Sequence, residues 1–176
     1  YLWQPLESLK SVKSNKTIFV GSLHRNKINI LSKLYRTGNL DIFGRSTLKQ
    51  KLYFMAKSRT LIPVRELPYQ NINKKYAKYY KGLNIHNWGL SSFGNYRLYD
   101  YLVHGIYQFC EHGELLIQKL GIPEYMFKFF KNDLELENSL DLNPQLNKKD
   151  INEAISFARS KLNASHLMTN ALESIK

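Results

Sequence analysis

Cysteine, long apolar runs and the common nucleotide-binding fingerprints are scarce or missing in this chain of 176 residues. The one cysteine, Cys110, excludes an internal disulfide framework and indicates a reducing compartment such as the cytoplasm. It lies in a strand-like run, and we expect a buried, inert thiol. No apolar run approaches the roughly 20 residues needed to cross a bilayer. Residues 1–5 have neither the basic nor the apolar segment of a secretory signal.

Acidic residues are scarce in the first half of the chain. Residues 1–81 contain 17 Lys and Arg against 3 Asp and Glu, whereas residues 82–176 contain 9 against 11. The formal net charge of +12 therefore originates in the N-terminal half. Such a field attracts an anionic partner, which is a nucleotide, a nucleic acid or an acidic membrane. Charge alone does not choose among the three.

Short β-branched and aromatic runs alternate with stretches of helical periodicity. We predict strands at 17–21, 40–44, 83–86, 106–110 and 125–130, and a short irregular one at 61–64. We predict helices at about 28–35, 46–58, 71–80, 95–104 and 114–120. In the second helix, capped by Ser46, the apolar Leu48, Leu52, Met55 and Ala56 are expected to face inward. The alternation predicts an α/β fold, a Rossmann-like doubly wound parallel sheet with helices on both faces.

The chain divides by composition into three parts. Residues 1–15 are predicted to be a linker, and residues 16–147 a Rossmann-like lobe. In residues 148–176 two apolar stripes, 151–162 and 167–175, predict C-terminal helices that pack back on the lobe. The acidic, polar stretch 132–147 is the expected flexible surface segment.

In doubly wound sheets, ligands bind beyond the carboxyl ends of the strands. This rule selects three loops, 21–26, 44–46 and 86–95. In the first loop, "GSLHRNK", Gly21 allows a sharp turn, and Ser22, Arg25 and Lys27 place donors at a helix N-terminus, which favours anions. The loop matches neither G-x-G-x-x-G nor a P-loop, so the residues alone allow a phosphate contact or a solvated basic loop.

The stretch "LNIHNWGLSSFGNYRLYDYLVHG" offers more candidates. His86 directly follows a strand and is either a structural histidine or a ligand-facing group. Gly94 permits a close backbone approach, and Asn95 can cap the next helix. Arg97 and Asp100 share one helix face, where they form a surface salt pair or contact a phosphate and a ribose. The histidines show no metal-ligand spacing, so we predict no protein-only metal site and no cofactor.

Another segment, "KKYAKYYKG", interleaves bases and aromatic residues. Such a pattern is able to bind nucleic acid, but it also fits a helix whose lysines extend over a tyrosine-covered core. A basic nucleic-acid-binding module without catalysis is therefore the alternative function. Contact with an anionic membrane is a third possibility.

The order of these segments resembles the C-terminal lobe of GT-B glycosyltransferases, in particular the spore-maturation-protein-like group of glycosyltransferase family 1 type. The resemblance rests on "YLWQP", "TIFVGSLHRNKINILSKL", "LDIFG", "ELPYQNINKKYAKYYKGLNIHNWG" and "NYRLYDYLVHGIYQF", and it covers residues 1–131. Arg97, Asp100 and Gly105 match the arginine, the glutamate and the glycine of the family segment beside the donor nucleotide. Gly21 and Ser22 match the loop that faces the donor phosphates, with Arg25 or Lys27 supplying charge.

This resemblance implies an enzyme that transfers a sugar from a nucleotide-sugar to a glycan or a lipid-linked acceptor. A complete GT-B enzyme has two Rossmann-like lobes and normally needs well over 300 residues, so the N-terminal acceptor lobe and any base that it supplies are missing here. We therefore expect the donor-binding lobe of a longer enzyme, or a remnant. We also expect it in the cytoplasm, where peripheral contact with the inner membrane face would fit its charge. No catalytic residue is assigned.

Overall fold

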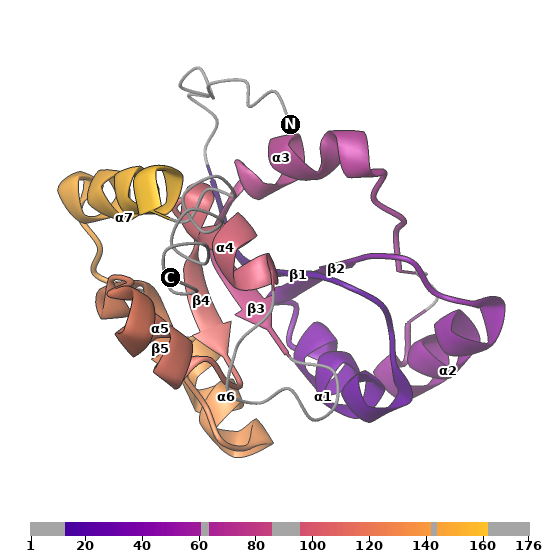
Figure 1. Cartoon of the computed structure of the whole chain (residues 1–176). Coiled ribbons are helices and arrows are strands. Elements are labelled where there is room, and N and C mark those ends of the chain that lie inside the picture. The colour runs from indigo at the N-terminus through magenta and orange to yellow at the C-terminus, as the bar shows by residue number, and fades with distance from the viewer. Residues whose placement is uncertain (1–12, 61–63, 86–95, 142–143, 162–176) are drawn as a thin grey trace, which may run out of the picture.

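The computed structural model describes residues 13–60, 64–85, 96–141 and 144–161 (Figure 1). Its strands are β1 Ser14–Val20, β2 Leu40–Phe43, β3 Tyr79–Asn84, β4 Tyr107–Cys110 and β5 Phe127–Phe129. Its helices are α1 Arg25–Arg36, α2 Leu48–Ser58, α3 Ile72–Tyr76, α4 Tyr96–Val103, α5 Glu114–Leu120, α6 Asp133–Leu140 and α7 Lys148–Lys161. Two 3₁₀ turns lie at Tyr69–Asn71 and Glu124–Met126.

The strands form one sheet in the order β2-β1-β3-β4-β5, and every pairing is parallel. In the register, Val20 of β1 lies opposite Phe43 of β2, and Asn84 of β3 lies opposite Cys110 of β4. All five carboxyl ends therefore lie at the same edge of the sheet. The predicted fold class, a doubly wound parallel α/β sheet, is confirmed.

Alternating side chains of the strands face two separate layers of the core. Phe19, Leu83 and Phe109 pack in one cluster with the buried residues of α1, α2 and α6. Ile18 and Val20 face the other way and pack with Tyr76 of α3 and Tyr101 of α4. A third cluster joins α4 to α5 and α7 through residues such as Leu98, Ile117 and Ala154. Helices α1 and α4 thus cover opposite faces of the sheet, as is typical of the doubly wound fold.

Helix α2 differs from its prediction in two respects. Its cap is Thr47 rather than Ser46, because the Thr47 side chain accepts a hydrogen bond from the Gln50 amide while Gln50 bonds back to the Thr47 amide. The inward stripe expected at Leu48 and Leu52 is wrong, since these side chains are 73% and 55% exposed. Only Phe54 and Ser58 of this helix are buried.

Two other predictions are corrected, and a third is described only in part. The helix expected at 71–80 ends at Tyr76, and Tyr79 and Tyr80 begin β3, whose aromatic residues favour a strand. The stretch 132–147 is not a loop throughout, because Asn132 caps α6 and Leu136 and Leu140 are buried. Most of the short strand expected at 61–64 lies outside the described residues; next to it, a single parallel bridge joins Arg65 to Phe43.

The remaining elements follow the sequence closely. Cys110 is a buried free thiol, as predicted, and burial raises its pKa. Helix α7 packs on α4, and Ala154 and Ala158 are buried in that contact. The second tail stripe, 167–175, lies outside the described residues. In the part of the chain that the structure describes, no helix has the length and apolar character that a membrane span requires.

Candidate functional site

The strand order marks one place in the sheet as the expected ligand site. Strands β1 and β3 are hydrogen-bonded neighbours, but the chain leaves β1 toward β2 and leaves β3 toward β4, in opposite directions. Connections that diverge in this way leave a gap beyond the carboxyl ends of the two strands, where ligands of doubly wound proteins bind. The residues that follow Val20 and Asn84 are therefore the first candidates.

Gly21 lies in close contact with the neighbouring loop. Its amide donates a 2.8 Å hydrogen bond to the carbonyl of Phe43 at the end of β2. Gly44 has a φ of +151°, and a Cβ on it would lie 2.1 Å from the carbonyl oxygen of Gly21. Only two glycines allow the backbones after β1 and β2 to approach this closely. The carboxyl edge is thus lined with main chain at this point.

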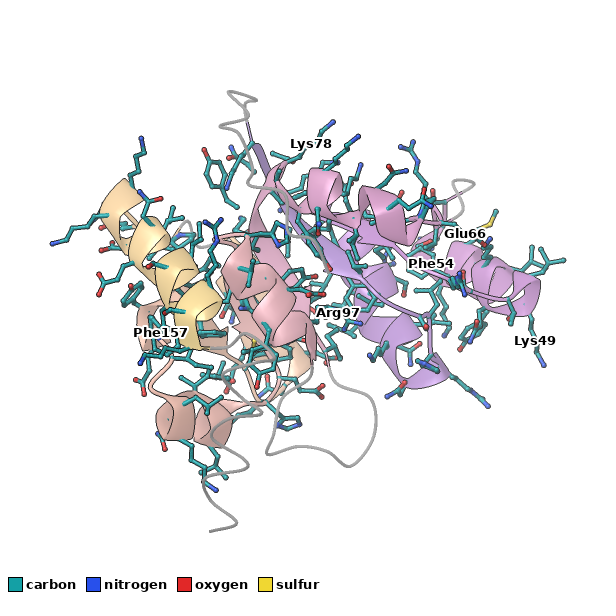
Figure 2. The ribbon with its side chains drawn as sticks, turned by 45° about the horizontal axis from the view of Figure 1, so that its top comes forward. Lys49, Phe54, Glu66, Lys78, Arg97 and Phe157 are labelled. Carbon is teal, nitrogen blue, oxygen red and sulfur yellow. The ribbon has the colours of Figure 1, made fainter. Side chains whose placement is uncertain are left out.

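Arg97 extends from the first turn of α4 toward Gly21 (Figure 2). A Cβ on Gly21 would lie 3.1 Å from a terminal guanidinium nitrogen of Arg97. The guanidinium carbon is 5.8 Å from the centroid of the Phe19 ring, within the range of a cation–π interaction. Asp100 lies one turn further along α4, where burial raises the pKa of its carboxyl and the charge of Arg97 opposes that rise. The two residues share an electrostatic environment at the end of β1.

Lys27 brings a second positive charge from the opposite face of the sheet. Its side chain is buried, and its Nζ donates a 2.8 Å hydrogen bond to the carbonyl oxygen of Ile85, just beyond β3. Burial, followed by repulsion from Arg97, lowers the pKa of Lys27 to about 8, while Glu111 acts in the opposite sense. A buried ammonium near a guanidinium is unfavourable unless an anion approaches both. This pair is therefore suited to bind a negatively charged group.

Tyr101 ties α4 to both of the strands that flank this site. The hydroxyl of Tyr101 lies 3.2 Å from the carbonyl oxygen of Ile18 and 3.4 Å from that of Leu83, and its one proton is shared between these two acceptors. Its ring is fully buried and packs on Tyr76 with the ring centroids 5.2 Å apart. Because Tyr101 is one turn from Arg97, this anchor holds the start of α4 relative to the sheet.

The nine predicted site residues are distributed as follows. The structure brings Gly21 and Lys27 close to Arg97, and the charge of Arg97 also acts on Asp100. Ser22 and Arg25 are exposed around the start of α1, where His24 is the N-cap and no acid lies in the first turn. The positive end of α1 therefore carries no acidic side chain in its first turn, which favours an anion from outside. His86, Gly94 and Asn95 lie outside the described residues.

Glu111 belongs to the same edge, and the sequence reasoning missed it. It follows β4 directly, its amide donates to the carbonyl oxygen of Asn84 at 3.2 Å, and its charge acts on Lys27. The rule that selected the loops after β1 and β3 applies equally to the first residue after β4. The signal was present, since Glu111 is the first charged residue after the strand.

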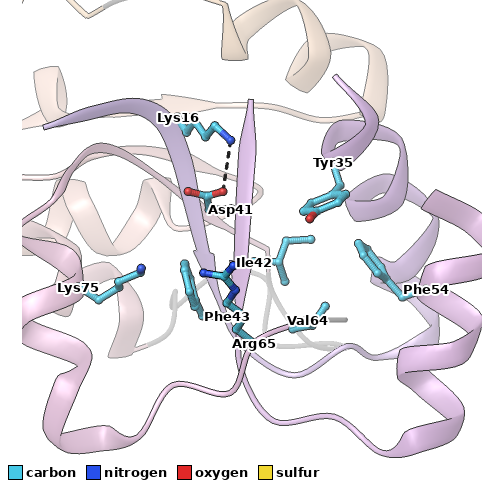
Figure 3. Close-up of a pocket in the computed structure, with 9 residues that line it drawn as sticks. All are labelled: Lys16, Tyr35, Asp41, Ile42, Phe43, Phe54, Val64, Arg65 and Lys75. Atoms are coloured by element: carbon cyan, nitrogen blue, oxygen red, sulfur yellow. Dashed lines mark ion pairs between the residues drawn. The ribbon is translucent and has the colours of Figure 1, made fainter. Parts of the chain in front are cut away.

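A separate cavity of about 250 Å³ runs along the outer edge of β2 (Figure 3). It is lined by Lys16, Tyr35, Asp41, Ile42, Phe43, Phe54, Val64, Arg65 and Lys75. Its one acid, Asp41, accepts a 2.7 Å hydrogen bond from the Tyr79 hydroxyl and lies 3.6 Å from the Nζ of Lys16. These internal partners already satisfy the carboxylate, so we place the candidate site at the ends of β1 and β3 instead. Among the described residues, no three potential metal ligands cluster.

Comparison with known proteins adds a fold assignment. No protein-family model and no curated protein sequence matches the chain. A structure of a mutant T4 phage BGT in complex with UDP-glucose matches with a TM-score of 0.59 and 16% identity, over 93% of this chain and 48% of that one. The chain has a GT-B-like fold. A second structure, of the DNA-modifying enzyme β-glucosyltransferase with and without uridine diphosphoglucose, matches with a TM-score of 0.55 and 14% identity, over 93% and 53% of the two chains.

The GT-B-like chain thus spans about half the length of each solved structure that it matches. Its fold agrees with the resemblance drawn from the sequence. The finer resemblance, to the spore-maturation-protein-like group, stays a prediction.

Proposed function

We propose that this chain is the donor-binding lobe of a glycosyltransferase and that the ends of β1 and β3 bind the diphosphate of a nucleotide-activated sugar. One observation carries the proposal. Lys27 and Arg97 come from helices on opposite faces of the sheet, yet both bring positive charge to the edge beside Gly21. An anion bound beside Gly21 would relieve the repulsion between the buried Lys27 and the half-buried Arg97.

Each residue of the proposed site contacts a different part of the donor. The backbone of Gly21 and Ser22 and the first amides of α1 face the diphosphate, and Arg97 neutralises its charge. Arg25 and Lys27 add positive potential around it. Asp100 accepts hydrogen bonds from the ribose hydroxyls. These roles, together with those of His86, Gly94 and Asn95, complete the predicted donor site.

Sugar transfer breaks the bond between the anomeric carbon and the terminal phosphate oxygen of the donor. The acceptor hydroxyl oxygen forms the new bond and loses its proton to a base that we do not assign. Negative charge develops on the leaving nucleoside diphosphate, and fixed positive groups at that position lower the barrier because they need no reorganisation. Arg97 and the start of α1 serve this purpose without a metal ion or another cofactor.

The comparisons also support a choice of donor to test first. One matched structure is a complex with UDP-glucose, and the other enzyme is described in the presence and absence of its substrate uridine diphosphoglucose, so a UDP-sugar is the first candidate. The proposed acceptor is a glycan or a lipid-linked sugar, and a second lobe would contribute its binding surface.

The nucleic-acid-binding alternative loses its main support. Its "KKYAKYYKG" segment is divided between α3 and β3, and Tyr76, Tyr79 and Lys81 are buried. Of the three tyrosines only Tyr80 is exposed, so the segment lacks the row of accessible rings on which bases stack.

Thermal unfolding with nucleotides tests the proposal. UDP or UDP-glucose at about 100 times its Kd should stabilise the fold by about 2.7 kcal/mol, because it binds only the native state. This corresponds to a rise in Tm of roughly 5 to 10 °C for a chain of this size. GDP, dTDP and ADP measured in parallel identify the base, and EDTA should not change the shift.

Arg97→Ala should abolish the shift. Arg36→Ala is the matched control, because Arg36 is an exposed arginine in the last turn of α1, at the other end of the sheet. The proposal fails if no nucleotide or nucleotide-sugar raises the Tm, or if both variants respond as the wild type does.

A further inference from the structure

Helix α2 exposes two leucines and a tyrosine on the side that faces away from the core. Its buried residues, Phe54 and Ser58, are four apart and mark the face that meets the rest of the molecule. At 100° per residue, the opposite face carries Leu48, Leu52 and Tyr53, which are 73%, 55% and 39% exposed. Water is an unfavourable environment for two adjacent leucines on the outermost helix of this side of the molecule (Figure 1).

Positive charge surrounds this apolar face. Helix α2 contains Lys49, Lys51 and Lys57 and no acidic residue, and Arg45 and Arg59 flank it. Lys51 pairs with Glu66 at 3.1 Å, and the Nζ of Lys57 lies 5.7 Å from the centroid of the Tyr53 ring. Figure 2 shows Lys49 pointing away from the body of the molecule. The exposed face of α2 is therefore both apolar and basic.

The same face leads to the candidate donor site. A groove of about 630 Å³ lies between the start of α1 and the exposed face of α2. Its lining residues are Arg25, Ile28, Lys49, Gln50, Leu52 and Tyr53. Arg25 thus belongs both to this groove and to the rim of the edge where β1 ends.

We propose that the outer face of α2 docks on an anionic membrane surface. Leu48 and Leu52 enter the boundary between headgroups and acyl chains, Tyr53 lies at the headgroup level, and Lys49 and Arg45 lie over the lipid phosphates. Lys57, which lies over the Tyr53 ring, adds to the positive potential of the same helix. The docking is independent of the donor. Its consequence, that a lipid-linked acceptor reaches the carboxyl edge of the sheet along the groove, rests on the proposed function.

The combination of groups favours lipid over other occupants. A second copy of the chain would bring the basic residues of two α2 helices against each other, and repulsion would oppose that contact. A nucleic acid would pair with the lysines and stack on Tyr53, but it would leave Leu48 and Leu52 in water. An anionic bilayer supplies hydrocarbon for the leucines and phosphate for the cations in one surface.

Vesicle co-sedimentation of the full chain tests this docking. Wild type should bind vesicles that contain about 30% phosphatidylglycerol and should not bind pure phosphatidylcholine, since each basic residue contributes about fivefold in affinity near an anionic surface. Binding should be lost at about 0.5 M salt, where charges are screened. Leu48→Ser/Leu52→Ser and Lys49→Gln/Lys57→Gln should each weaken binding about tenfold or more.

Matched controls use the same substitutions elsewhere. Leu115→Ser/Leu134→Ser changes two other exposed leucines, and Lys119→Gln/Lys128→Gln removes two other exposed lysines. Neither pair should change vesicle binding. Both α2 variants should keep the rise in Tm with UDP, which shows that fold and donor site are intact.

The outcomes separate the two proposals. Vesicle binding that needs α2 while no nucleotide raises the Tm contradicts the donor site and leaves the docking surface standing. The docking surface is overturned if the α2 and control variants bind vesicles alike. It is also overturned if wild type binds no anionic vesicles, or if the leucine variants instead lose binding to an oligonucleotide or a dimer seen by size-exclusion chromatography.

Discussion

A buried lysine lies at each of the two edges of the sheet, but the two lysines have different roles. Each lysine donates to a backbone carbonyl. Lys27 donates to Ile85 at 2.8 Å at the carboxyl edge, and Lys81 donates to Leu140 at 3.0 Å near the end of α6. Burial lowers the pKa of both, but Lys81 has Asp141 beside it, whereas Lys27 has Arg97.

This difference separates a structural cation from one suited to bind a ligand. Lys81 satisfies a carbonyl at the C-terminus of α6, where a positive charge is favourable. Lys27 also satisfies a carbonyl, and Glu111 offsets part of its cost, but the nearby guanidinium keeps its ammonium in an unfavourable field. An anion bound from outside would offset this repulsion, so Lys27 and Arg97 are the cations that we expect to contact a ligand.

The largest expected effect compares a glycine from each edge. Gly44→Ala places a Cβ 2.1 Å from the Gly21 carbonyl, so the loops after β1 and β2 must separate. We expect a loss of about 4 kcal/mol in the free energy of unfolding and no response to UDP. Gly38→Ala has a φ of +78° but no atom within 4 Å, and should cost only about 1 kcal/mol. Urea unfolding of both variants measures this, and equal losses would contradict the crowding at Gly44.

The second comparison replaces the two buried lysines. Lys81→Met leaves the Leu140 carbonyl without its donor and should cost about 2 kcal/mol of stability, with UDP affinity unchanged. Lys27→Met also loses a hydrogen bond but removes repulsion from Arg97, so it should cost less than about 1 kcal/mol and weaken UDP binding about tenfold. Unfolding and isothermal titration measure the two effects. Equal losses of stability and of UDP affinity in the two variants would contradict the difference between the two edges.

A third prediction follows from the pKa of Lys27, which is about 8 in the folded chain and 10.5 for an ordinary lysine. Between these values the unfolded chain holds more protons than the folded one, so the contribution of Lys27 to stability rises with pH. The stability of wild type relative to Lys27→Met should increase by about 1.5 kcal/mol from about pH 8 to 9.5. UDP affinity of the wild type should fall over the same range, as the ammonium loses its charge. If the stabilities of wild type and Lys27→Met change with pH in the same way, the Lys27 ammonium is not destabilised in the folded chain.

The smallest effect compares the two ends of α1. Arg25 and Arg36 are both exposed, and only Arg25 lies at the end of α1 next to Gly21. Arg25→Ala should weaken UDP binding about twofold to threefold, since solvent screens an exposed charge, and Arg36→Ala should not change it. Titration at low and high salt measures both, and the difference should vanish at high salt.

The sequence was sufficient for the sheet because its strands are short apolar runs closed by glycine or a polar residue. The runs from Thr17 to Gly21 and from Leu40 to Gly44 predict β1 and β2 without any tertiary information. The topology alone predicts that the loops after β1 and β3 lie beside the ligand site, because the chain leaves these two strands in opposite directions. It therefore also selects Gly21 and Lys27 as candidates.

Other features depend on packing that periodicity does not reveal. An apolar stripe on α2 has the same pattern whether it meets a core or a partner, so Leu48 and Leu52 were placed inside. The boundary between α3 and β3 was missed because Tyr79 and Tyr80 continue the helical spacing while they pair in the sheet. No local pattern reports that Arg97 lies over the Phe19 ring, since that contact joins α4 to β1.

The anchor at Tyr101 has a consequence for how a ligand is received. Because its hydroxyl holds α4 to β1 and β3 from within the core, the long side chain of Arg97 starts from a fixed root. Binding of a ligand then costs less conformational entropy than it would if α4, and with it Arg97, were loosely held. Tyr101→Phe, which keeps the ring and removes the tether, would turn a pre-shaped receptor into one that must be assembled at each encounter.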